Sequence, residues 1–171
     1  NVAAEAYHIL YNHAYGIAAT SLRLTNTYGP RHQMRHSRQG VVNWFARKLI
    51  DAEEIEIFGS GSQKRDLNYI DDVIDAMLMA MASAQTNGGV FNLGGTSVSL
   101  LDMVKTMIKS NGKGRYRFID YPKQNRKVEI GDYAADYRKF RDLLGWQPKI
   151  SLEEGMRRKL EYYKKYKRYY W

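Results

Sequence analysis

Residues 21–32, SLRLTNTYGPRH, begin as an apolar strand and end as a turn flanked by polar side chains. The apolar and β-branched residues of 18–25 predict a buried strand, and Tyr28-Gly29-Pro30 predicts its end. In open parallel sheets, ligands lie beyond the carboxyl ends of the strands. Asn26 stands at such an end, where its amide can donate to a phosphate or sugar oxygen. An asparagine that only closes a turn explains the same position, so spacing alone leaves both interpretations open.

The composition limits the classes of protein to consider. The 171 residues fit one domain or a large piece of a longer enzyme, and 44% of them are hydrophobic, enough for a core. No apolar run approaches the roughly 18 residues that span a bilayer. The absence of cysteine excludes disulfides and thiol catalysis, and a cytoplasmic setting is expected. The net charge of +9 favours an anionic partner: nucleic acid, an acidic membrane or a phosphorylated small molecule.

Helical and extended stretches alternate along the chain, which predicts an α/β fold with parallel strands. The helix at 71–84 is apolar on nearly every face, so it should be buried. Ser99 with Asp102, and Ser151 with Glu154, are capping boxes that predict helix starts. Helices are expected at 2–14, 41–50, 71–84, 99–110, from Asp136 to Gly145 and at 152–170; strands are expected at 18–25, 54–58, 67–70, 90–94 and 115–119.

The stretch GSGSQKRD, residues 59–66, is a second candidate for a ligand site. It predicts a flexible loop, and the Arg65 guanidinium could bind phosphate oxygens from there. The loop lacks the glycine-lysine-serine/threonine ending of a P-loop, and Arg65 could equally form a salt bridge. Phe58, at the end of the preceding strand, could stack on a nucleobase or belong to the core. Leu93-Gly94-Gly95-Thr96 is expected to be a tight turn from a strand into a helix.

The C-terminal stretch MRRKLEYYKKYKRYYW mixes tyrosines with basic residues, a pattern that suits RNA binding. However, an amphipathic helix that packs on the body and leaves its lysines in solvent explains the pattern without nucleic acid, and this interpretation is favoured. The apolar face of this C-terminal helix would carry Leu152, Met156, Leu160, Tyr163, Tyr166 and Tyr170.

His32 and His36 have a spacing that suits zinc, but neighbouring arginines would repel a cation, so no metal is expected.

Taken in order, these stretches resemble one family: the C-terminal half of extended short-chain dehydrogenase/reductases, the NAD-dependent epimerases and dehydratases of nucleotide sugars. The patterns R-x-x-N-x-YGP and G-x-G-x-x-x-RD-x-x-Y-x-DD carry the resemblance in combination. It covers nearly the whole chain through AAEAY, YGIAATSLRLTNTYGPR, IEIFGSGSQKRDLNYIDDVIDAM, GGVFNLGG, IGDYAAD and LLGWQPKISLEEGM.

The resemblance implies the C-terminal part of a Rossmann-type parallel sheet plus a smaller nucleotide-sugar-binding domain. Residues 1–33 would end the NAD-binding domain. Residues 34–171 would form mainly the substrate domain, with 71–110 returning to the Rossmann sheet. A nucleoside-diphosphate sugar would be the substrate and NAD the cofactor.

Particular site residues follow from the same resemblance. Asn26 and Arg65 would contact the diphosphate of the nucleotide sugar, and Phe58 and Val41 would contact the nucleobase. Leu24 would lie near the nicotinamide end of NAD. Asp132 matches a family aspartate near the nucleotide. Glu129 occupies the place of the arginine that usually stands three residues before that aspartate, so Lys127 or Arg126 would take over its role.

The family's glycine-rich NAD loop and its Tyr-x-x-x-Lys pair belong to an N-terminal half that has no counterpart in these residues. We therefore expect no catalytic residue in this chain and no activity from it alone. The missing half, or another chain, would complete it, and a homodimer would form through helix 2–14. The alternatives are a non-catalytic nucleotide-sugar-binding protein or a basic nucleic-acid-binding module.

Overall fold

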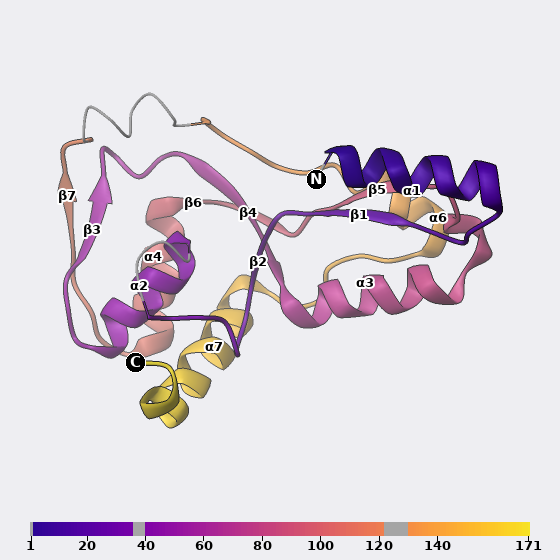
Figure 1. The fold of residues 1–171 in the computed structure, drawn as a ribbon. Coiled ribbons are helices and arrows are strands. Elements are labelled where there is room, and N and C mark those ends of the chain that lie inside the picture. The colour runs from indigo at the N-terminus through magenta and orange to yellow at the C-terminus, as the bar shows by residue number, and fades with distance from the viewer. Residues whose placement is uncertain (1, 36–39, 122–129) are drawn as a thin grey trace.

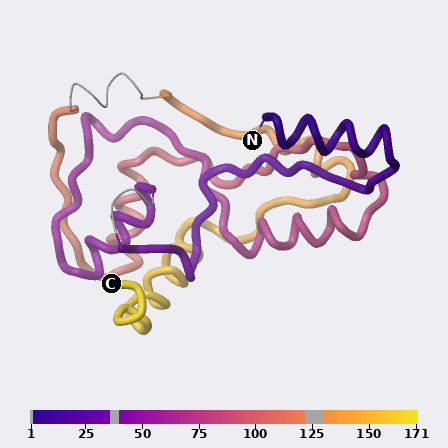
Figure 2. The backbone as a smooth tube through the Cα atoms, in the orientation of Figure 1, coloured from indigo at the N-terminus to yellow at the C-terminus, as the bar shows by residue number. Residues whose placement is uncertain are grey.

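The computed structural model describes residues 2–35, 40–121 and 130–171. The chain is elongated, with one two-stranded parallel sheet near each end and a three-stranded sheet between them (Figure 1). We call the two ends the β1–β5 end and the β3–β7 end. The backbone passes between these ends repeatedly (Figure 2). The α/β class predicted from the sequence is confirmed.

At the β1–β5 end, β1 (Ser21–Leu24) pairs in parallel with β5 (Val90–Leu93). The helix α1 (Val2–Tyr15) covers one face of this pair and α3 (Ile70–Ala82) the other (Figure 1). The short helix α6 (Arg138–Leu144) packs on β5 through Phe140, whose ring centroid lies 5.3 Å from that of Phe91. Among the described strands, β1 has only β5 as a neighbour, so its other edge is open.

At the β3–β7 end, β3 (Ile55–Phe58) pairs in parallel with β7 (Tyr116–Ile119). The helices α2 (Val41–Ile50), α4 (Leu100–Asn111) and α7 (Leu152–Tyr166) pack together beside it. The main hydrophobic core lies between these elements and includes Phe45, Ile57, Met103 and Met156.

The central sheet has the order β2 (Asn26–Tyr28), β4 (Lys64–Tyr69) and β6 (Thr96–Ser99). The pair β2–β4 is parallel, but β4–β6 is antiparallel, so the expectation of parallel strands throughout is wrong at this edge. Gly94-Gly95 therefore turns the chain from strand into strand, and the helix begins only after Ser99. A Cβ on Gly95 would lie 2.0 Å from the Leu67 carbonyl oxygen, so only glycine lets the two backbones approach this closely.

Several predicted boundaries differ from the observed ones. The expected strand over 18–25 is shorter and continues, after Thr25, into a second strand. The strand expected at 67–70 begins at Lys64, which places Arg65 in a strand and not in a loop. The helix expected from Asp136 begins at Arg138, whose N–H donates to the Asp136 carboxylate at 3.0 Å.

The expectation that the helix at 71–84 is buried is wrong. Only Asp72, Val73, Ala76 and Ala80 of α3 are buried, while Met81 is 84% exposed and Ile74, Met77 and Leu78 are also exposed. The apolar character on every face predicts neighbours on every side. Within the described residues, α3 is covered on one side only.

The helix α7 forms where the capping box predicted it, with Ser151 Oγ accepting from the Glu154 N–H at 3.2 Å. Its apolar face is buried through Leu152, Met156, Leu160 and Tyr163, as expected. The expectation that its lysines all face solvent is wrong for Lys159, which is 0% exposed. Residue 159 lies three positions after Met156 and one before Leu160, so helical periodicity places it on the inward face.

Candidate functional site

Asn26 lies where the chain crosses from the β1–β5 end into the central sheet. It begins β2 rather than ending a strand, and its exposed side chain donates from Nδ2 to the Asp66 carbonyl at 3.1 Å. Asp66 is the neighbour of Arg65 on β4. The pairing of β2 with β4 places Asn26 opposite Leu67, the residue that follows the R-D motif.

Arg65 and Asp132 lie together at the beginning of β4. The Arg65 Nη1 donates to the carbonyls of Lys64 at 2.8 Å and Gly131 at 2.7 Å. The Asp132 Oδ1 accepts from the Lys64 backbone N–H at 2.8 Å. Two stretches that are far apart in sequence thus meet here, and both charged side chains reach the surface.

Val41 and Phe58 line a common cavity of about 390 Å³, at the β3–β7 end. Phe58 is half-buried, and its ring centroid lies 5.5 Å from that of Tyr121, so it is not a core residue. The Leu100 N–H, at the edge of this cavity, donates to the Gln63 carbonyl at 3.0 Å, two residues before Arg65. The cavity therefore adjoins the strand that carries Arg65. Its lining consists of Val41, Trp44, Phe45, Lys48, Glu56, Phe58 and Leu100.

Leu24 lies apart from these residues, at the carboxyl end of β1. It is exposed and lines a groove of about 530 Å³ between α1 and β1. In the same groove, Arg23 forms a two-pronged ion pair with Glu5, at 2.8 and 2.6 Å. The hydrogen bonds from Arg23 hold the pKa of the Glu5 carboxyl below its usual value.

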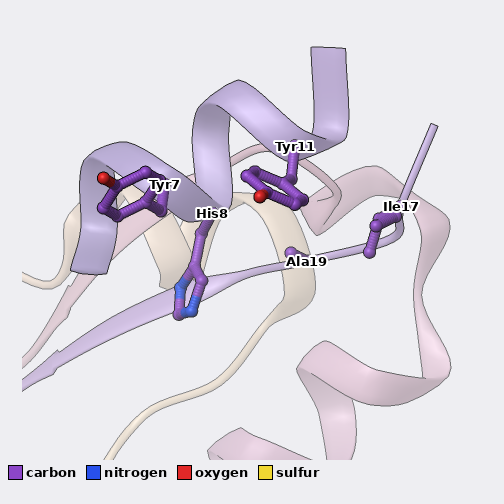
Figure 3. A pocket seen from close by; sticks show the side chains of 5 residues that line it. All are labelled: Tyr7, His8, Tyr11, Ile17 and Ala19. Carbon is purple, nitrogen blue, oxygen red and sulfur yellow. The ribbon is translucent and has the colours of Figure 1, made fainter. Parts of the chain in front are cut away.

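A further pocket of about 510 Å³ lies between α1 and the segment that follows it, and it holds none of the predicted site residues. Figure 3 shows Tyr7, His8 and Tyr11 projecting from α1 above Ile17 and Ala19 of the segment that follows it. The His8 ring points toward β1, where its Nδ1 lies 3.1 Å from Ser21 Oγ.

Asp66 of the RD motif and Asp72, the second aspartate of the DD motif, are buried, and each carboxylate bonds backbone N–H groups that are distant in sequence. The two Asp66 carboxylate oxygens accept from the Gly95 N–H at 2.6 Å and the Ala135 N–H at 2.7 Å. Those of Asp72 accept from the Lys149 and Ile150 N–H groups at 3.1 and 3.0 Å. The motif is therefore partly structural, a role that its sequence pattern does not reveal.

Some predicted residues lie beyond these observations. Lys127, Arg126, Glu129 and His36 fall outside the described residues. Within the described ranges, no group of three or more His, Asp or Glu side chains could hold a metal ion. The helices of those ranges include none that is both long and apolar enough to span a membrane.

Known proteins match this chain over about half of their own length or less. UDP-glucose 4-epimerase of Mycolicibacterium smegmatis is 32% identical over 167 residues, which is 95% of this chain and 51% of the relative. UDP-glucuronic acid decarboxylase 1 of Xenopus tropicalis is 31% identical over 168 residues, 95% of this chain and 37% of the relative. In the crystal structure of Thermotoga maritima UDP-glucose 4-epimerase with UDP-glucose, the protein is 34% identical in sequence to this chain, and the TM-score is 0.83. The match covers 96% of this chain and 52% of the epimerase chain.

The family model described as "NAD dependent epimerase/dehydratase family" matches residues 1–94, which is more than half of the chain. The matched residues include β2, which begins at Asn26, the whole of β4 and the parallel pair β1 and β5. The similar structures have the Rossmann-type α/β architecture that the sequence motifs predicted. This chain belongs to the NAD-dependent epimerase/dehydratase family, of whose members it spans about half the length.

Proposed function

We propose that this chain is the nucleotide-sugar-binding part of an NAD-dependent nucleotide-sugar epimerase or dehydratase. The supporting observation is the convergence of Asn26, Arg65 and Asp132 on β4, next to a cavity lined by Val41 and Phe58. A guanidinium and an amide suit diphosphate oxygens, and an aromatic-walled cavity suits a nucleobase. The net charge of +9 agrees with an anionic ligand.

The proposal assigns NAD to the groove beside Leu24. The groove of about 530 Å³ is bounded by α1 and by residues 20–24, so there is room for part of a dinucleotide. When bound, NAD would accept and return a hydride at the sugar. Of the proposed NAD contacts, this chain supplies Leu24.

Three other expectations remain predictions: the boundary between domains at residues 33 and 34, the homodimer through helix 2–14 and the cytoplasmic setting.

The nucleic-acid alternative has little support from α7. Its arginines are engaged with acidic residues of the same helix: Arg157 contacts Glu154 and Glu161 at 2.8 Å, and Arg158 contacts Glu154 at 2.6 Å. Its tyrosine Tyr163 is buried and unavailable for stacking on a base. The acidic partners also weaken the attraction of this helix for phosphates.

Arg65→Ala in the complete protein should weaken the binding of a nucleoside diphosphate such as UDP by about 1.5–3 kcal/mol, the range for a hydrogen bond to a charged group. Isothermal titration calorimetry measures this directly. Lys64→Ala is the matched control, because it removes the same charge from the adjacent position while the backbone N–H that binds Asp132 remains. An unchanged affinity in Arg65→Ala, or an equal loss in Lys64→Ala, would remove Arg65 from the site.

The isolated 171-residue chain should associate or aggregate, bind no NAD tightly and turn over no nucleotide sugar. The open edge of β1 and the exposed Met77, Leu78 and Met81 of α3 would drive association. Light scattering and an NAD titration test this expectation. Leu78→Lys with Met81→Lys should reduce the association, whereas a stable wild-type monomer with micromolar NAD affinity would contradict it.

A further inference from the structure

Three residues of α7, spaced four apart, run along the segment that follows β2. Gly155 faces Tyr28: a Cβ on Gly155 would lie 2.3 Å from the Tyr28 hydroxyl. Lys159 Nζ donates to the Gly29 carbonyl at 3.0 Å. The Tyr163 hydroxyl accepts from the His32 N–H at 2.7 Å and donates to the His32 carbonyl at 2.9 Å. One face of α7 thus holds both ends of residues 29–32, which we call the post-β2 segment.

This segment contains a conformation that needs such support. Arg31 has a φ of 63°, in the left-handed region that side chains other than glycine rarely adopt. Such conformations persist where the surrounding structure enforces them. The contacts of Lys159 before Arg31 and of Tyr163 after it supply that constraint.

Lys159 also reaches a second element of the candidate site. Its Nζ donates to Asn43 Oδ1 at 2.6 Å, and both side chains are buried. Asn43 lies on the first turn of α2, between Val41 and Trp44, two of the residues that line the cavity. A single amino group therefore joins the segment three residues after Asn26 to the helix that walls the cavity.

If position 159 served only to fill space in the core, an apolar side chain would stabilise the fold more than lysine. The side chain is 0% exposed, and burial alone lowers the pKa of its amine to about 7. A methionine could fill similar space without desolvating an amine, and buried charged groups often stabilise less than apolar side chains of similar volume. What an apolar side chain cannot supply is the pair of N–H donors that meet Gly29 and Asn43. A neutral amine has two such donors, so the link survives deprotonation.

We infer that Lys159 is a positioning residue of the nucleotide site: its amine fixes the post-β2 segment against α2, and so sets the place of Asn26 relative to the cavity of Val41 and Phe58. This inference rests on the proposed function for the identity of the ligand. The mechanical link itself is independent of any ligand, so the two can be tested separately.

The test compares Lys159→Met with Leu160→Ala in the complete protein. Leu160 is the adjacent residue of α7, is equally buried and makes apolar contacts in the main core, so its truncation destabilises the helix without touching the link. Hydrogen–deuterium exchange is measured on peptides covering 27–35 and 40–50, and UDP affinity by calorimetry well below the unfolding temperature. Lys165→Met, at an exposed position of α7, controls for loss of charge.

In Lys159→Met, we expect faster exchange in both peptides and unchanged exchange over 90–94, with a loss of UDP affinity of about tenfold, the equivalent of one hydrogen bond. Leu160→Ala and Lys165→Met should keep the affinity within about twofold. Unchanged exchange in Lys159→Met, or the same exchange and affinity losses in Leu160→Ala, would overturn the inference. If the wild type binds no nucleoside diphosphate, the proposed function fails, and the exchange comparison alone decides whether Lys159 holds the segment.

Discussion

Asp66→Ala should lower the free energy of unfolding by about 2–6 kcal/mol, because it leaves two partly buried N–H groups without their acceptor at about 1–3 kcal/mol each. Asp66 is 1% exposed, and its carboxylate joins β4 to Gly95, before β6, and to Ala135, before α6. Chemical denaturation of the complete protein measures the change.

Two further variants serve as controls: one removes the charge of Asp66 but keeps one of its oxygens, and the other removes an exposed carboxylate nearby. Asp66→Asn keeps one oxygen but turns an amide NH₂ toward an N–H donor, so about half of the loss should remain. Asp71→Ala removes an exposed carboxylate that lies 3.5 Å from Arg158, and should cost less than about 1 kcal/mol. If Asp66→Ala lowered the free energy of unfolding by less than about 1 kcal/mol, the two hydrogen bonds to the Asp66 carboxylate would contribute little to stability.

The wild type should gain stability between neutral and alkaline pH, and Lys159→Met should abolish that gain. Burial lowers the pKa of the Lys159 amine from 10.5 to about 7. Below pH 7 both the folded and the unfolded states carry the charge, so the full cost of burying it is felt. Between the two pKa values the unfolded chain keeps a proton that the folded state has released, so the free energy of unfolding rises with pH.

The expected rise is up to about 3 kcal/mol from pH 7 to pH 9.5, at about 1.4 kcal/mol per pH unit. It is best measured as the difference between wild type and Lys159→Met at each pH. Burial raises the pKa values of Tyr28 and Tyr163, so these phenols destabilise the folded state only as pH passes the unfolded value near 10. A difference that stays constant over this pH range would show that the folded state keeps Lys159 charged.

Local sequence signals predicted those elements whose determinants are local. Ser99 and Ser151 cap their helices because each hydroxyl accepts from an N–H three residues later. Gly16 and Gly145 follow helices and have φ values of 66° and 73°, as C-terminal glycines should. The helix at Val41–Ile50 matches its predicted bounds because its apolar periodicity is clear.

Features that depend on distant partners were missed. The antiparallel strand β6 exists because it pairs with β4, about 30 residues earlier. Thr96 and Val98 suit a strand, but a stretch of four residues does not by itself predict one. The exposure of α3 depends on which neighbours are present, which periodicity cannot report. Lys159 was assigned to solvent by residue type, although its position on the helix predicted burial.

The candidate site was predicted mainly through the family resemblance. Local chemistry left Asn26 and Arg65 with equally good structural explanations. The structure adds that Asn26 pairs with Leu67 of β4, two residues after Arg65, and that Val41 and Phe58 share a cavity. The functional roles of these residues remain predictions until binding is measured.

The hold of α7 on the post-β2 segment has a consequence for biosynthesis. Tyr163 lies 131 residues after His32, and at roughly 5–20 residues per second the ribosome needs on the order of 10 s to make the intervening chain. During that time the carbonyl of Gly29 and both backbone groups of His32 lack their partners. The segment beside Asn26 can therefore be ordered only late in synthesis, and in nascent chains that stop before α7 it would stay open to proteases.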